Sequence, residues 1–256
     1  MLIKLFKHEA KSVFRLLLPL YGAALVLTGL CKLTLLFGWF GSSNLWVAIP
    51  SGLLFAGTIL GLVALMFTTV LIVVLRFYKN LLGDEGYLLF TLPVTPTQLL
   101  LSKLLIGVGA VLASAVLLFG CFVFLAWGAF SFPPLPAAVW LVLPMFGICL
   151  LAGAFMKCLV FYTAVCIGPS IVQNRLAGSV IAFVAISTIS SVLLFILMLG
   201  TGAIAALTGL MPALLALPET SLILLLFGGA SMVFLLYGIV LFFISRHMLT
   251  KHLNLA

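Results

Sequence analysis

Long apolar runs recur along this chain, and short stretches between them hold most of its polar and charged residues. A run such as Leu53–Leu75 is apolar on every helical face, and about 20 residues of α-helix are needed to cross ~30 Å of hydrocarbon. Strands of a membrane β-barrel would alternate apolar and polar residues instead, which this pattern excludes. The pattern therefore predicts an all-α polytopic membrane protein, a single transmembrane domain over residues 1–256. Its six spans are predicted at 16–38, 52–75, 97–130, 138–168, 178–200 and 221–244.

Residues 1–15, before the first span, place basic side chains on one stripe of a helix and apolar side chains on its neighbour. The basic residues are spaced by three and four: Lys4, Lys7, Lys11 and Arg15. This is typical of an interfacial helix that lies in the headgroup plane beside anionic lipid. A second interpretation, a basic flank that leads directly into the first span, stays open.

Residues 201–220 are apolar but are interrupted by Gly202, Gly209, Pro212 and Pro218, which leaves pieces too short to span. Backbone that is not one continuous helix survives at membrane depth only where protein buries it. We therefore expect an outer re-entrant hairpin between the last two spans, with an ordinary interfacial helix as the alternative.

Charge is sparse, with 12 lysines and arginines and four acidic residues, and it gathers at the ends of the apolar runs. No basic patch with interleaved aromatic residues is present, so nucleic acid is not expected as a partner. Six spans put both termini on one face, together with nearly all basic residues: Lys4, Lys7, Lys11, Arg15, Arg76, Lys79, Lys103, Lys157, Arg175, Arg246 and Lys251. The positive-inside rule makes that face cytoplasmic in a multi-pass protein of the cell membrane. Lys32, near the outer end of the first span, is expected to extend its ammonium to the interface.

Candidate chemistry within the chain is limited. The four acidic residues, Glu9, Asp84, Glu85 and Glu219, all fall outside the middle of the spans, which disfavours a carboxylate relay for ions. The sequence has no G-x-x-x-x-G-K-[ST] loop for ATP and no H-E-x-x-H or G-x-S-x-G motif. We therefore expect neither an enzyme nor a cofactor in this chain, and any ATP-driven activity would need a separate ATPase.

The densest group of charges lies in residues 76–103, between the second and third spans. Thr95-Pro96-Thr97-Gln98 has the features of a helix start, with Thr95 as N-cap and proline at the first helical position. Upstream, Gly83 can end the preceding helix, and a short helix is predicted from Asp84 to Thr91. That helix would carry an apolar surface suited to a cytoplasmic partner, although aromatic residues also favour the membrane interface.

The sequence RFYKNLLGDEGYLLFTLP, from Arg76 to Pro93, followed by Ser102-Lys103, resembles the cytoplasmic loop of small ABC-2 type permeases, the membrane subunits of bacterial ABC transporters. In that family the EG-x-x-x-x-x-LP segment forms a coupling helix that docks on a P-loop ATPase, which binds ATP and magnesium. The resemblance implies that these residues form or shape the contact: Asp84, Glu85, Gly86, Tyr87, Leu88, Leu89, Phe90, Leu92 and Pro93. It also implies a second permease subunit and identifies 201–220 with an extracellular hairpin. It carries over no substrate-binding residues.

The resulting expectation is a permease subunit of an ABC exporter. Because the spans carry few charges, the cargo is expected to be amphipathic or apolar, such as an antimicrobial peptide, a lipid-like molecule or a drug. Two alternatives remain open: a membrane scaffold or sensor that binds a cytoplasmic partner without transport, and an intramembrane enzyme. The second is disfavoured because no histidine lies within a span to activate a nucleophile.

Overall fold

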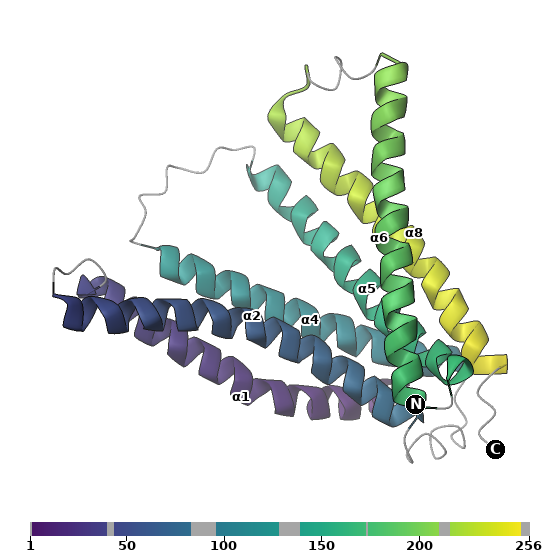
Figure 1. The fold of residues 1–256 in the computed structure, drawn as a ribbon, viewed down its shortest axis with the longest axis horizontal. Helices are drawn as coiled ribbons and strands as arrows, with labels where there is room; N and C mark the ends of the chain where they lie inside the picture. Colours follow the sequence, from purple (N-terminus) through teal and green to yellow (C-terminus); the bar gives the residue numbers. More distant parts are fainter. Residues whose placement is uncertain are drawn as a thin grey trace. The chain divides into compact units, whose positions relative to one another are not determined.

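The computed structural model describes residues 2–39, 44–82, 96–127, 139–172, 174–209 and 216–251. Within those ranges the chain forms six long α-helices and no strand (Figure 1). They are α1 (Leu2–Leu36), α2 (Leu45–Leu82), α4 (Pro96–Ala126), α5 (Val139–Ile171), α6 (Arg175–Leu207) and α8 (Glu219–Lys251). Each is long and apolar enough to cross a membrane, which confirms the six helices predicted from the apolar runs.

Several helices are longer than a bilayer requires. Helix α2 has 38 residues, which corresponds to about 57 Å at 1.5 Å per residue, against a hydrocarbon thickness of ~30 Å. The excess must be accommodated by tilt or by turns that continue outside the hydrocarbon. At the C-terminal end of α2 the extra turns, Arg76–Leu82, form the start of the segment singled out above.

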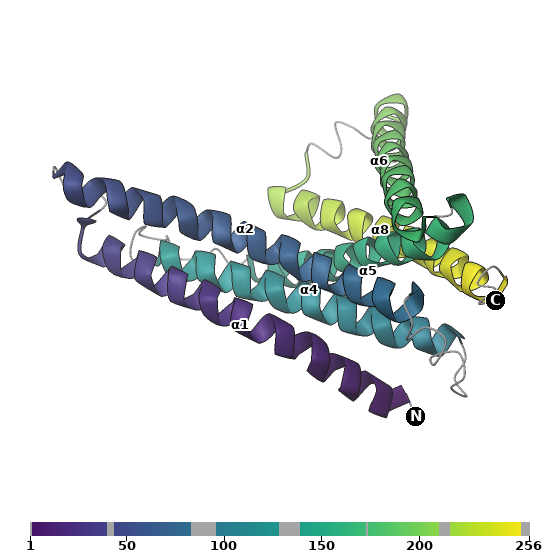
Figure 2. The ribbon, with the colours of Figure 1, turned by 60° about the horizontal axis from the view of Figure 1, so that its bottom comes forward.

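Residues 2–15 are helical and continue without a break into the first predicted span, so that both belong to α1 (Figure 2). A single continuous helix favours the interpretation of these residues as the basic flank of the first span. Their placement in the headgroup plane stays a prediction.

The structure places Gly202 inside α6, which continues to Leu207 before a turn at Gly209 with a φ of 68°. Residues 201–207 are therefore the last turns of a span and are not a separate element. Residues 210–215 lie outside the described part of the chain, and the re-entrant hairpin predicted for 201–220 stays a prediction.

The chain divides into two compact units. Unit 1 comprises Met1–Arg76 and Leu105–Pro134, and unit 2 comprises Phe77–Leu104 and Leu135–Ala256. In unit 1, α1, α2 and α4 lie side by side (Figures 1 and 2) around a core of Ala24, Leu62, Leu65 and Cys121. In unit 2, α5 packs against both α6 and α8.

Ser114 of α4 joins the three helices of unit 1. Its hydroxyl oxygen lies 2.8 Å from the hydroxyl of Tyr21 on α1 and 2.9 Å from that of Thr69 on α2. Hydrogen bonds of this kind hold helices together where lipid removes the hydrophobic driving force for association.

The side chain of Lys32, a residue of α1, contacts the C-terminal end of α4. Its ammonium donates hydrogen bonds to the backbone carbonyl oxygens of Leu125, at 3.2 Å, and of Trp127. The last carbonyls of a helix lack intrahelical partners, and a cation there is favoured by the helix dipole. Sequence reasoning identified the tendency of this lysine to seek the outer end of its span, and the structure adds the carbonyls that it binds.

The connection from α5 to α6 brings two glycines into contact. A Cβ added at Gly168 would lie 2.5 Å from the backbone nitrogen of Ser179, and one added at Gly178 would overlap the carbonyl oxygen of Gly168. Asn174 precedes α6, and its side-chain oxygen accepts a hydrogen bond of 3.3 Å from the amide of Leu176. The start of α6 can approach the end of α5 this closely only because neither glycine has a side chain.

We expect Gly178→Ala to destabilise the protein by about 1–3 kcal/mol, because the added methyl overlaps a backbone atom that cannot rotate away. Thermal unfolding in detergent, followed by circular dichroism, measures the effect. Gly200→Ala is the matched control, since Gly200 lies in the same helix with no neighbouring atom within 4 Å of an added Cβ. Equal unfolding temperatures for Gly178→Ala and the native chain would contradict the close approach.

Candidate partner-docking site

The residues predicted to contact a partner belong to residues 83–95, which lie outside the described part of the chain. These are Asp84, Glu85, Gly86, Tyr87, Leu88, Leu89, Phe90, Leu92 and Pro93, and their roles stay predictions. The structure does describe both sides of this segment. Helix α2 extends to Leu82, and α4 begins at Pro96, as the helix-start signal predicts.

Each flank of the segment has a buried residue that contacts α5. On the first flank, Phe77 of α2 is 3% exposed and stacks on Tyr162 of α5, with ring centroids 3.9 Å apart and an interplanar angle of 12°. On the second flank, Lys103 of α4 is 5% exposed, and its backbone carbonyl accepts a hydrogen bond of 3.1 Å from the Tyr162 hydroxyl. A single tyrosine thus contacts both helices that lead into residues 83–95.

Tyr162 is 2% exposed, so its hydroxyl is buried in apolar surroundings. A buried hydroxyl without a hydrogen bond is costly, which favours retention of the bond to the Lys103 carbonyl. The aromatic stack with Phe77 contributes ~0.5–1.5 kcal/mol beyond the area that it buries. These two contacts differ in kind, since the stack involves the face of the ring and the hydrogen bond involves its edge.

The neighbours of Tyr162 contact the two remaining helices of unit 2. Phe161 stacks on Phe183 of α6, with centroids 4.6 Å apart and an interplanar angle of 6°. The hydroxyl of Thr163 lies 2.8 Å from that of Ser245 on α8. Consecutive residues of an α-helix point about 100° apart, so these three side chains leave α5 in three directions. We call residues 161–163 the α5 hub.

The α5 hub brings together particular ends of the helices in unit 2. It contacts α2 and α8 in their last turns and α4 and α6 in their first turns, close to the C-terminal end of α5 itself. This alternation is the one expected for helices that run back and forth across a membrane. Basic side chains lie close in sequence to the same helix ends: Lys79, Lys103, Lys157 and Arg246.

The α5 hub was not identified from the sequence. Its residues belong to 158–168, the last part of the fourth predicted span. In the structure most of these side chains are buried against other helices, among them Leu159, Tyr162 and Thr163. The available signal is a tyrosine and a threonine in a mostly apolar span, since polar side chains of this kind form hydrogen bonds between membrane helices.

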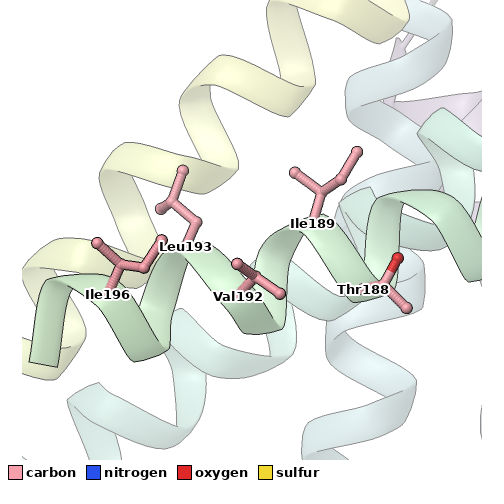
Figure 3. A pocket seen from close by; sticks show the side chains of 5 residues that line it. All are labelled: Thr188, Ile189, Val192, Leu193 and Ile196. Atoms are coloured by element: carbon pink, nitrogen blue, oxygen red, sulfur yellow. The ribbon is translucent and has the colours of Figure 1, made fainter. Parts of the chain in front are cut away.

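A hollow of about 450 Å³ lies on α6, lined by Thr188, Ile189, Val192, Leu193 and Ile196 (Figure 3). All five side chains come from one helix. The hydroxyl of Thr188 donates to backbone carbonyls of its own helix, at 2.9 Å from both Val184 and Ala185. Ligand sites usually combine an apolar lining with a few convergent polar groups, and this hollow has no such group directed into it from its lining residues.

No protein-family model, curated protein or solved structure matches this chain. The fold by itself therefore defines only a broad class. The described residues form six helices that fit a multi-pass membrane protein.

We expect the hydroxyls of Thr163 and Ser245 to be coupled by about 0.6 kcal/mol, the average for such pairs between membrane helices. A double-mutant cycle with Thr163→Ala and Ser245→Ala, read from reversible unfolding in detergent, measures this coupling. Ser170→Ala provides the control, because Ser170 is exposed and bonds the carbonyl of Ile167 in its own helix. The changes in the free energy of unfolding caused by Ser170→Ala and Ser245→Ala should add. If the changes caused by Thr163→Ala and Ser245→Ala also add, the Thr163–Ser245 contact is refuted.

Proposed function

We propose that this protein is the transmembrane permease subunit of an ABC exporter, driven by a separate P-loop ATPase that docks on residues 83–95. The observation that carries the proposal is that both flanks of this segment are bound to one buried residue, Tyr162. A partner that moves the segment would thereby move packed helices. The resemblance of 76–103 to the loop of ABC-2 type permeases identifies the kind of partner.

The proposed arrangement is two permease subunits with two ATPases in the cell membrane. Both termini and residues 83–95 lie on the cytoplasmic face, where the ATPases bind ATP and magnesium. Closure of the ATPases on ATP would displace the docked segments, and the helices would follow as a largely rigid-body change. This source of energy requires no carboxylate within the spans.

The proposed cargo is amphipathic or apolar, such as an antimicrobial peptide, a lipid-like molecule or a drug. Support comes from the apolar surfaces of the described helices, which expose many large aliphatic and aromatic side chains. A cargo with apolar surface can be accommodated by such helices without a buried charge to match it.

The proposal is tested by affinity purification of the intact chain from its native cell in mild detergent, with mass spectrometry of the proteins that co-purify. We expect a stoichiometric P-loop ATPase. Its recovery should fall at least about tenfold, equivalent to ~1.4 kcal/mol, in Gly86→Trp, which blocks close approach, and in Glu85→Arg, which reverses a charge. Circular dichroism should show an unchanged helical fold in both variants.

Gly200→Trp is the matched control, because it adds the same side chain in α6, where no neighbouring atom lies within 4 Å of an added Cβ. It should retain the ATPase. Normal recovery in both Gly86→Trp and Glu85→Arg would place the docking site elsewhere. If no ATPase co-purifies in any of several detergents, the exporter proposal fails, and a membrane scaffold or sensor with another cytoplasmic partner becomes the better explanation.

A further inference from the structure

The contacts of Tyr162 have a distribution that packing alone does not require. Its ring holds the end of α2, its hydroxyl holds the beginning of α4, and the adjacent Phe161 and Thr163 hold α6 and α8. Of the four contacted helices, α2 and α4 flank residues 83–95, and α6 and α8 pack on α5. Three consecutive residues therefore connect the flanks of the proposed docking segment to the other helices of unit 2.

We propose that Tyr162 is a positioning residue that fixes the last turns of α2 and the first turns of α4, which flank residues 83–95, to α5, and that the α5 hub passes displacements of these flanks to α6 and α8. This inference rests on the proposed function for the identity of the partner that moves the segment. The positioning itself is a property of the chain alone.

Tyr162 contacts each flank through a different part of its side chain, α2 through the ring and α4 through the hydroxyl. The stack on Phe77 covers the facing surfaces of the two rings and fixes the last turns of α2. The hydroxyl bonds the Lys103 carbonyl, which lies about two turns after α4 begins at Pro96. A backbone carbonyl has two lone pairs, so this bond can form in addition to the helical one. Removal of the hydroxyl should therefore loosen the first turns of α4 on α5 and leave the contact with α2.

Transmission from the α5 hub to the other helices depends on stiff contacts. The stacked rings of Phe161 and Phe183 cannot separate without loss of buried area, and the Thr163–Ser245 hydrogen bond is short and buried. Packed interiors move as units and do not deform continuously. A shift of Tyr162 should thus appear at α8 as a change in its distance from α2.

The test is a set of distance distributions from electron–electron double resonance on the full chain in lipid nanodiscs. Spin-labelled unnatural amino acids leave the five native cysteines in place. One pair of labels, at Lys79 and Leu101, reports the spacing of the two flanks, and both positions are exposed. A second pair, at Lys79 and Arg246, reports the link from α2 to α8. A third pair, at Leu143 and Leu226, lies at the opposite ends of α5 and α8 and reports the fold.

In the native chain we expect one narrow maximum for each pair. Tyr162→Leu should lose the narrow maximum for the first and second pairs and keep it for the third. Tyr162→Phe removes the hydroxyl and keeps the ring. It should therefore broaden the distance distribution of the first pair and leave that of the second pair narrow, as in the native chain. Tyr237→Phe is the matched control, because the hydroxyl of Tyr237 joins α8 to Ser190 of α6 and contacts neither flank. It should leave the first pair narrow.

The inference is overturned if Tyr162→Leu leaves the Lys79–Leu101 distribution narrow, or if it broadens all three pairs alike, which would indicate a role in the fold as a whole. A second pair that stays narrow in Tyr162→Leu would overturn the transmission to α8. Failure of the proposed function is a separate result, because it appears as the absence of an ATPase from the purified chain and leaves these distances interpretable.

Discussion

Hydrocarbon is as apolar as a leucine side chain, so burial of apolar surface does not hold membrane helices to one another. The specific contacts between helices therefore decide the packing of this protein. In unit 1 the contact is made by hydroxyls that meet at Ser114, and in unit 2 by the α5 hub and by the hydroxyls of Ser190 on α6 and Tyr237 on α8, which lie 3.0 Å apart. Close approach of Gly168 and Gly178 adds a contact that only small residues permit.

The same constraint explains which parts of the fold can be predicted from the sequence. Six helices follow from apolar runs, because a span must satisfy its own backbone groups and expose apolar side chains. The start of α4 at Pro96 follows from a proline that fits the first turn. The end of α6 does not follow, because glycine costs only about 1 kcal/mol in a helix and is common in membrane helices. Gly202 was interpreted as a break, and the helix continues through it.

The partners of Tyr162 could not be predicted for a related reason. Helix α5 is mostly apolar, and its few polar residues do not form one face that indicates which side is buried. The hydroxyl bonds a residue 59 positions away, and no local pattern encodes such a pairing. The predicted docking residues were instead recognised from a resemblance, and the structure adds the buried flank residues that connect their segment to the spans.

The position of the α5 hub also bears on how a cytoplasmic partner could act on helices that are mostly exposed to lipid. Helices α6 and α8 expose large apolar side chains along most of their length. A displacement of residues 83–95 would reach these helices only through an element whose end is buried and well packed. Residues 161–163 would provide this end under the proposal, because within three residues α5 contacts both flanks of the segment, α6 and α8. If α6 and α8 are moved through α5 in this way, the packing contacts need no charge inside the membrane, in agreement with spans that carry few charges.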